Sequence, residues 1–268
     1  MKVAVTLVQM RVEAARPEAN LGRGEAFVAE AAKRGSLLVC FPEMWTTGFN
    51  WEWNAAHLGE QESVSERVGA MARRHGVWLS GSLLLADDAG RPANTHVLFD
   101  PEGRRAAVYR KAHLFSLMGE DRHMAPGDAL ALAETPWGPT GLSVCYDLRF
   151  PELFRSYALK GAAVILSPTA FPYPRLDHWR VLVRARAIEN QCFFAGTNQV
   201  GAEDLGAAGG VTYFGASALV DPWGRTLAEG SETEEELLTA EMDLAEVGAV
   251  RSRMRVFADR RPDLYDLG

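Results

Sequence analysis

Residues 37–43 read LLVCFPE, an unbroken apolar run that ends in a proline and a glutamate. A short run that is apolar at every position is typical of a strand covered on both faces, as in the sheets of α/β proteins. The amphipathic stretch before it, residues 21–34, predicts a helix that Gly35 ends. Apolar runs and amphipathic stretches alternate in this way from Val3 to Met242, so we expect an α/β fold.

The same pattern predicts further elements along the chain. We expect helices at residues 64–75, 151–160 and 178–190, and strands at 3–8, 37–41, 78–85, 95–99, 105–109, 141–144, 163–166, 192–197, 216–220 and 237–242. The periodicity fades between residues 111 and 139, which predicts a long functional loop. Residues 201–210, rich in Gly and Ala, predict a mobile surface loop. With no break in composition and no residue-level repeat, we expect one domain over residues 1–268, in which 251–268 form a C-terminal tail.

The composition indicates a globular protein and excludes several other classes. Of the 268 residues, 47% are hydrophobic and 24% are charged. A chain of this length can bury a large core without disulfides, unlike disordered, fibrous or small disulfide-rich proteins. The formal net charge is −7, whereas a nucleic-acid-binding protein normally shows a basic excess or stripe. We therefore expect no nucleic-acid partner.

The cysteines and the lengths of the apolar runs indicate the cellular compartment of the protein. Cys40, Cys145 and Cys192 are odd in number and form no CxxC motif, which argues against a disulfide framework and a zinc site. The N-terminal apolar run is too short for a signal peptide, and no window approaches the roughly 20 apolar residues of a membrane span. We expect a cytoplasmic protein with no membrane partner, in a compartment where a free thiol persists.

Three chemically reactive side chains follow predicted strands. Glu43 comes after the strand 37–41, Lys111 after 105–109 and Cys145 after 141–144. Functional groups gather beyond the carboxyl ends of strands in α/β sheets, so these three can meet. A carboxylate can take the thiol proton as the sulfur attacks, and an ammonium stabilises the thiolate and the oxyanion that forms. The three residues form a candidate triad, to which the main-chain N–H of Tyr146 can add a second oxyanion donor.

Each of these residue types also has an ordinary structural interpretation. A cysteine that ends an apolar strand is commonly a small core residue, and we assign Cys40 and Cys192 to the core for that reason. A glutamate after a proline is commonly a solvated loop acid, and a lysine beside Arg110 is commonly a surface base. On composition and spacing alone, the triad is one hypothesis among these.

Three segments in this order resemble the signature motifs of the nitrilase superfamily of carbon–nitrogen hydrolases. They are residues 41–49 (FPEMWTTGF), 109–115 (YRKAHLF) and 142–153 (LSVCYDLRFPEL), which carry Glu43, Lys111 and Cys145 in the family's order. Supporting similarities extend over the whole chain, at residues 5–10 (VTLVQM), 184–191 (RARAIENQ), 220–224 (VDPWG) and 260–265 (RRPDLY). Three motifs in order over one chain are a specific signal.

The resemblance implies a fold and a mechanism. The fold is a four-layer α-β-β-α sandwich that pairs as αββα-αββα in a homodimer, with the tail 251–268 reaching across the interface. Glu43 is implied as the general base, Lys111 as the electrostatic stabiliser and Cys145 as the nucleophile. Glu120 is implied to orient Lys111 and the substrate, although a solvated loop acid is the ordinary alternative. The reaction runs through a thioester acyl-enzyme and needs no metal or organic cofactor.

The motif variants resemble two amidase branches of the family. Residues 145–152 (CYDLRFPE) look like those of amidases for small acidic amides, since nitrile-cleaving members usually have Trp and Glu after the cysteine. Residues 45–49, 113–115 and 189–191 resemble bacterial omega-amidases, which deaminate amides of 2-oxo acids such as 2-oxoglutaramate. The two C-terminal segments also resemble the amidase that repairs deaminated glutathione. We expect an amidase for a small carboxylated amide, with deaminated glutathione amidase, nitrilase or N-carbamoyl amide hydrolase as alternatives.

A carboxylated substrate requires a group that binds its anion. We expect Arg175 to do so, because a guanidinium forks onto a carboxylate, and an exposed loop arginine is the alternative. We expect Arg149 to be structural and paired with a buried acid. His113 and His123 have no third ligand at a metal-site spacing, so we expect no metal there. Side chains that can wall the pocket, or belong simply to the core, are Phe49, Phe115, Met118, Phe171 and Tyr173.

Two non-enzymatic functions are the alternatives from another class. A silent family member that serves as a binding or assembly subunit would be expected to lack at least one triad residue, and this chain has all three together with Glu120. A thiol redox sensor would use a low-pKa Cys145 but leaves Glu43 and Lys111 unexplained.

Overall fold

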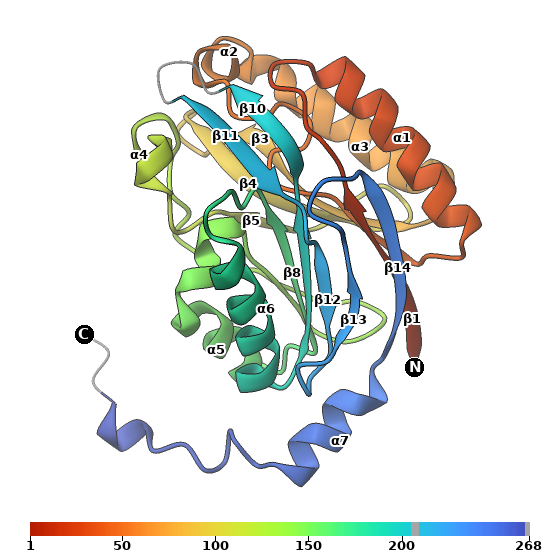
Figure 1. Cartoon of the computed structure of the whole chain (residues 1–268), viewed down its shortest axis with the longest axis vertical. Helices are drawn as coiled ribbons and strands as arrows, with labels where there is room; N and C mark the ends of the chain where they lie inside the picture. The colour runs from red at the N-terminus through yellow and green to blue at the C-terminus, as the bar shows by residue number, and fades with distance from the viewer. Residues whose placement is uncertain (205–208, 266–268) are drawn as a thin grey trace.

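Two six-stranded sheets lie face to face at the centre of the molecule, which the computed structural model describes for residues 1–204 and 209–265 (Figure 1). Across the first sheet, the strands in order are β14 (Glu236–Asp243), β1 (Lys2–Gln9), β2 (Leu38–Cys40), β3 (Trp78–Ala86), β4 (Pro92–Phe99) and β5 (Arg105–Arg110). Across the second, they are β13 (Thr226–Glu229), β12 (Ala218–Val220), β9 (Phe193–Asn198), β8 (Val164–Thr169), β7 (Thr140–Leu142) and β6 (Leu132–Ala133). A separate two-stranded sheet pairs β10 (Val200–Asp204) with β11 (Gly210–Phe214).

Helices cover the outer face of each large sheet. The first sheet is covered by α1 (Pro17–Lys33) and α3 (Gln61–His75), and the second by α5 (Pro151–Leu159) and α6 (Leu176–Asn190) (Figure 1). The predicted four-layer α-β-β-α sandwich is thereby confirmed. The other described helices are α2 (Trp51–Ala56), α4 (Glu120–His123) and α7 (Ala245–Arg253), with 3-10 turns at Leu58–Glu60, Ser116–Met118, Cys145–Arg149 and Pro262–Leu264. Within the described ranges, no helix is long and apolar enough to cross a membrane.

The largest apolar core fills the space between the two sheets. Leu7 and Leu38 from the first sheet and Ile165 from the second are all fully buried in it. Cys40 and Cys192 belong to the same cluster, where burial raises the pKa of each thiol to about 12. Both are therefore core residues, as their surroundings in the sequence predict.

Parallel strands bring the functional segments of the two sheets to one edge. β1, β2 and β3 are parallel neighbours in the first sheet, as are β7, β8 and β9 in the second. Beyond their carboxyl ends the sheets are joined, because the N–H of Glu43 donates to the carbonyl of Thr169, the last residue of β8, at 3.3 Å. The side-chain amide of Gln199 donates to the carbonyl of Glu43 at 2.9 Å. The segment after β2 is thus held against the end of the second sheet.

The prediction of a mobile loop at residues 201–210 is wrong where the structure describes it. β10 and β11 pair in antiparallel register along their whole length, so residues 201–204 and 210 belong to strands. A glycine- and alanine-rich composition misleads here, because main-chain pairing does not depend on large side chains. Residues 205–208 lie outside the described residues.

Two other segments contain more regular structure than the sequence predicts. The segment 111–139 carries the turn Ser116–Met118, α4 and β6, which are too short for a hydrophobic period to be seen. The expected tail begins inside a helix, since α7 ends only at Arg253. α7 buries few side chains, among them Val247 and Val250, and so lacks a strong amphipathic pattern.

Candidate active site

A buried cluster of two carboxylates and one ammonium group lies beyond the ends of β2 and β5. Lys111 Nζ lies 2.7 Å from Oε1 of Glu43 and 2.7 Å from Oε2 of Glu120. Each of the three residues is at most 2% exposed, so water screens their charges little. Glu120 is the first residue of α4, and its Oε2 also accepts the N–H of Phe115 at 2.8 Å. The structure thus brings Glu120 against Lys111, whereas a solvated loop acid would be exposed.

Cys145 begins the 3-10 turn that follows β7. Its φ of 42° lies in a region that non-glycine residues rarely adopt, so the surrounding hydrogen bonds must offset a conformational cost. Asp147 supplies one of these bonds, since its Oδ2 accepts the N–H of Val144 at 2.8 Å. Cys145 lines the same pocket as Glu43 and Lys111, so the candidate nucleophile, base and cation share one space.

Burial governs the protonation of this cluster. Burial raises the pKa of the Cys145 thiol well above its ordinary value, and the Glu43 carboxylate adds to this, while Lys111 and the N–H of Ala170 oppose it. Burial likewise raises the pKa of Glu43, which Lys111 partly counteracts. Burial disfavours a charged Lys111, but the carboxylates of Glu120 and Glu43 outweigh that effect and raise its pKa. The thiol is therefore neutral at pH 7 and needs a base to attack.

Asn94 on β4 touches both carboxylates of the cluster. Its Nδ2 donates to Oε1 of Glu43 at 2.8 Å and to Oε1 of Glu120 at 3.0 Å, and the residue is fully buried. The sequence analysis did not single it out. Polar residues do alternate in the otherwise apolar strands β3 and β4, at Ser80 and Ser82 and at Asn94 and His96. Because a buried polar side chain needs a hydrogen-bond partner, this alternation on strands with buried faces was the signal in the sequence that could have identified Asn94.

A second buried network joins the segment of Lys111 to the turn of Cys145. Oδ1 of Asp147 accepts the main-chain N–H of His113 at 3.1 Å and lies 2.7 Å from Nδ1 of the same residue. Oδ2 of Asp147 accepts the hydroxyl of Tyr109 at 2.9 Å. Tyr109 and His113 lie two residues before and after Lys111. Asp147 therefore holds the main chain around Lys111 in a fixed relation to Cys145.

The two loop histidines have partners other than a metal. His113 bonds Asp147, and the ring of His123 stacks on Trp51 with centroids 5.3 Å apart. Over residues 1–204 and 209–265, no group of three His, Cys, Asp or Glu side chains could hold a metal ion.

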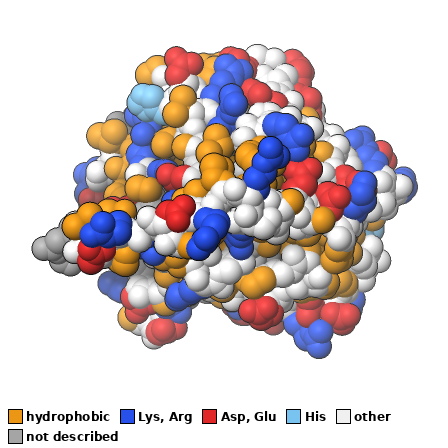
Figure 2. Space-filling view, turned by 90° about the horizontal axis from the view of Figure 1, so that it is seen from below, with side chains coloured by type: hydrophobic (Ala, Val, Ile, Leu, Met, Phe, Trp, Pro, Cys, Tyr) orange, Lys and Arg blue, Asp and Glu red, His pale blue; other side chains and the backbone are white. Residues whose placement is uncertain are grey.

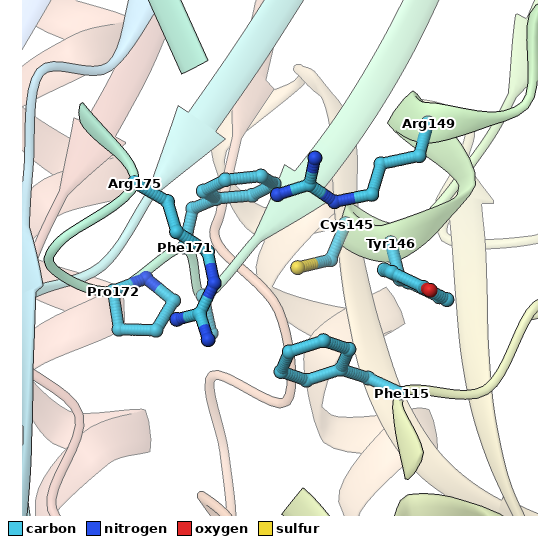
Figure 3. A pocket seen from close by; sticks show the side chains of 8 residues that line it. Phe115, Cys145, Tyr146, Arg149, Phe171, Pro172 and Arg175 are labelled. Atoms are coloured by element: carbon cyan, nitrogen blue, oxygen red, sulfur yellow. The ribbon is translucent and has the colours of Figure 1, made fainter. Parts of the chain in front are cut away.

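Cys145 lies in the wall between two adjoining cavities, which also share Phe115 and Ala170. The first cavity holds the charged cluster and is closed by Phe49, Trp51 and Met118. The second is lined in addition by Tyr146, Arg149, Phe171, Pro172 and Arg175 (Figure 3). Each encloses only about 250 Å³ of empty space at most, so the site suits a small ligand.

Two arginines border the second cavity. Figure 3 shows the sulfur of Cys145 directed into the space between the guanidinium groups of Arg149 and Arg175. Arg149 stacks over Phe171 at 5.3 Å, and Arg175 stacks over Phe115 at 5.4 Å. Among the described residues, no carboxylate forms an ion pair with either arginine. Both half-buried cations are therefore available to an anionic ligand.

Two expectations for this region need correction. Among the described residues, Arg149 is not paired with a buried acid. It lines the second cavity and donates to Nδ1 of His178 at 3.4 Å. Tyr173 does not wall the cavity. It is 41% exposed, and its hydroxyl donates to Oε2 of Glu232 at 2.6 Å. Phe115, Phe171, Phe49 and Met118 do line the two cavities.

Comparisons of the whole chain agree on one family. The model of the carbon-nitrogen hydrolase family matches residues 4–252. A 2-oxoglutaramate amidase from Bacillus subtilis (strain 168) is 37% identical over 267 residues, which cover 99% of this chain and 100% of the relative. The omega-amidase NIT2 of Homo sapiens is 31% identical over 270 residues, which cover 97% of this chain and 96% of the relative.

Solved structures agree with the sequence relatives. A carbon-nitrogen hydrolase from Helicobacter pylori G27 matches with a TM-score of 0.93 and 28% identity, covering 99% of this chain and 97% of that chain. A variant of an amidase from Nesterenkonia sp. AN1 matches with a TM-score of 0.86 and 27% identity, covering 98% of this chain and 95% of that chain. That structure contains the acetamide moiety of fluoroacetamide covalently added at the active site cysteine.

Proposed function

The chain belongs to the carbon–nitrogen hydrolase family, and we propose from this that it is a cysteine amidase that hydrolyses the terminal amide of small carboxylated substrates, such as 2-oxoglutaramate. The observation that carries the proposal is the buried cluster of Glu43, Lys111 and Glu120 in the same pocket as Cys145. A cysteine with a raised pKa beside a buried carboxylate is suited to attack with base assistance.

The first half of the reaction forms a thioester. The sulfur of Cys145 attacks the amide carbon while the thiol proton passes to Glu43. Lys111 Nζ donates to Oε1 of Glu43 at 2.7 Å and to both oxygens of Glu120, at 2.7 and 3.0 Å. In the proposed mechanism the two Glu120 oxygens share one of the three ammonium protons, and the third proton is given to the oxyanion. The N–H of Tyr146 is the proposed second donor. Glu43 then returns the proton to the amide nitrogen as the C–N bond breaks, which releases ammonia.

The second half of the reaction returns the free enzyme. A water molecule gives a proton to Glu43 as its oxygen attacks the thioester carbon. The C–S bond breaks, and the proton on Glu43 returns to the Cys145 sulfur. The sum of the two halves is amide plus water giving acid plus ammonia, so no redox group or metal enters the balance.

The two arginines of the second cavity support a carboxylated substrate. With the amide carbon at Cys145 and its nitrogen toward the Glu43 side, the far end of a short substrate reaches Arg149 and Arg175. A guanidinium binds a carboxylate through two parallel hydrogen bonds. The 2-oxoglutaramate amidase and omega-amidase names of the relatives point to the same class. Deaminated glutathione, nitriles and N-carbamoyl amides are the alternative substrates within this chemistry.

The non-enzymatic alternatives receive less support. A redox sensor needs a thiolate, whereas burial raises the pKa of the Cys145 thiol well above its ordinary value. A silent binding subunit has no use for a buried cation between two buried carboxylates, which is costly to maintain.

We also propose that the protein forms a homodimer through the layer of α5 and α6. Val181 and Ile188, seven residues apart on one face of α6, are 66% and 42% exposed. Gly224 lies against Ile188, and its neighbour in the sequence, Trp223, is 42% exposed. The segment after α7 passes below α5 and α6 in Figure 1, where the ring of Phe257 lies against the guanidinium groups of Arg155 on α5 and Arg251 on α7. Figure 2 shows apolar side chains exposed among charged ones of both signs on the face seen from below. Sedimentation of the chain truncated after Phe257 tests the tail, since an unchanged dimer would exclude the tail from the interface. A cytoplasmic location, which keeps a catalytic thiol reduced, is part of the proposal.

The decisive experiment measures ammonia released from 2-oxoglutaramate by the wild type and by Cys145→Ala, with Cys40→Ala as a control that removes a core thiol. We expect release by the wild type and by the control, but none by Cys145→Ala. Mass spectrometry with a slow amide should show an acyl adduct on Cys145. Release only from deaminated glutathione would change the substrate and keep the mechanism, whereas no ammonia from any amide would refute the proposal.

A further inference from the structure

We propose that Asn94 is a positioning residue, which holds the carboxyl groups of Glu43 and Glu120 so that one oxygen of Glu43 is reserved for the proton of Cys145. The inference rests on the proposed role of Glu43 as the base. Asn94 is fully buried and does not line either cavity, so it acts through its neighbours and not by touching substrate.

The hydrogen bonds of Asn94 define which way its amide faces. The N–H of Met44 donates to Oγ of Ser82 at 2.8 Å, so the Ser82 hydroxyl proton must point elsewhere. It points to Oδ1 of Asn94, which lies 2.8 Å away. Nδ2 of Asn94 therefore faces the two carboxylates and gives each of them one of its two protons. Every donor and acceptor of this buried amide is used.

This arrangement distinguishes the two oxygens of Glu43. Oε1 accepts from Lys111 Nζ at 2.7 Å and from Asn94 Nδ2 at 2.8 Å. No nitrogen or oxygen of the described residues donates to Oε2. Cys145 lines the same cavity as Glu43, and the Glu43 carboxylate adds to the rise in the pKa of the Cys145 thiol. Oε2 is therefore the oxygen that receives the thiol proton, and Asn94 with Lys111 prevents the carboxyl group from rotating away.

Asn94 also holds the main chain of Lys111, the third charged residue of the cluster. Its main-chain carbonyl accepts the N–H of Lys111 at 2.9 Å. One residue of β4 thus contacts Glu43, Glu120 and the main chain of Lys111. An aspartate of the same shape would add a third carboxylate beside the two already present, and alanine would leave both Oε1 atoms without this donor.

The test uses Asn94→Ala and Ser82→Ala, with Thr95→Val as the matched control. Thr95 is the buried neighbour on β4, and within the described part of the chain its hydroxyl bonds only the carbonyl of Ala93, away from the cluster. For Asn94→Ala we expect kcat to fall about 10- to 100-fold, the range of a hydrogen bond to a charged group, with KM within about twofold of the wild type. Loss of a donor raises the pKa of Glu43 further, so the acid limb of the kcat/KM profile moves to higher pH. Ser82→Ala should shift the limb in the same direction by less, and Thr95→Val should leave it in place.

A second readout needs no substrate. The rate at which iodoacetamide alkylates Cys145, measured by mass spectrometry across pH, should show the same displacement in Asn94→Ala. The alkylation rate does not depend on which amide is the substrate. Failure of the proposed positioning role of Asn94 can therefore be distinguished from failure of the proposed function. If Asn94→Ala does not fold, Ser82→Ala decides. An acid limb that stays in place in the folded variants, or a loss of kcat that Thr95→Val matches, would reduce Asn94 to a structural residue and overturn the proposal.

Discussion

Replacing Lys111 with methionine should damage both the stability and the activity of the protein. Methionine is unbranched and fills most of the space of the lysine stem, but the change removes the only cation within 3 Å of the Glu43 and Glu120 carboxyl groups among the described residues. Leaving a buried charge without its partner costs about 3–5 kcal/mol. A folded protein is typically stable by about 5–15 kcal/mol, so the variant should fold but unfold at a clearly lower urea concentration.

The loss of stability should depend on pH in a defined direction. Burial and Glu120 raise the pKa of Glu43, and the opposing effect of Lys111 is lost in the variant. A carboxyl group with a higher pKa in the folded state binds more protons there, so protonation stabilises the folded state. The destabilisation should therefore be greater at pH 8 and shrink as the pH falls toward the ordinary glutamate pKa of 4.5.

Urea unfolding at pH 8 and pH 5.5, followed by tryptophan fluorescence, measures this difference. Lys160→Met removes an exposed lysine and should change the free energy of unfolding by about 0.5 kcal/mol or less at both values. Turnover of Lys111→Met should fall by about 10²–10³-fold, as for loss of an oxyanion donor. Equal destabilisation at the two pH values would refute the charge argument, and near-normal turnover would refute the assigned role.

The other predictions concern the base, the substrate carboxylate and the packing of α1. In Glu43→Gln, the new side chain has the shape of glutamate but cannot act as a base. Acylation of Cys145, measured by mass spectrometry, should therefore stop while the thermal midpoint changes little. A normal acylation rate would exclude Glu43 as the base. Arg149→Ala and Arg175→Ala should raise KM about 10-fold or more for carboxylated amides, because each variant loses a charge-assisted hydrogen bond. The KM for a neutral amide such as butyramide should stay unchanged. An equal rise in KM for both substrates would mean that the arginines are structural. Gly24→Ala should lower stability by about 1–3 kcal/mol, because a Cβ would lie 2.5 Å from the Trp45 ring, whereas Gly22→Ala has open space and should be neutral or stabilising in thermal unfolding.

Local pattern in the sequence predicted the alternation of strands and helices, whereas the four layers and the place of Glu120 in the charged cluster were implied by the resemblance to the family. The apolar strand before Glu43 and the one before Cys145 are recognisable one segment at a time, and parallel neighbours carry their ends to the same edge. The site also required three separate segments to converge, which the family motifs, not the spacing, indicated.

The cavity position of Arg149, which we expected to pair with a buried acid, and the contacts of Asn94 were not predicted, for different physical reasons. Arg149 ends the 3-10 turn that Cys145 begins, and a turn of five residues is too short for a hydrophobic period to show which side chains enter the cavity. Asn94 lies inside an apolar strand, and its importance depends on Ser82 from β3 and two glutamates from other segments. Contacts of this kind join segments that are far apart in the sequence. Their only signal in the sequence is a polar residue within an otherwise apolar run.

The pairing of β1 with β14 has a consequence for how the chain is made. Every residue of β1 pairs with β14, from Lys2 with Asp243 to Gln9 with Glu236. During synthesis one edge of β1 therefore stays open until almost the entire chain has left the ribosome, long after Glu43, Lys111 and Cys145 have emerged. An open strand edge attracts other strands, so nascent chains halted before β14 should aggregate or recruit chaperones, whereas chains halted after it can close the sheet.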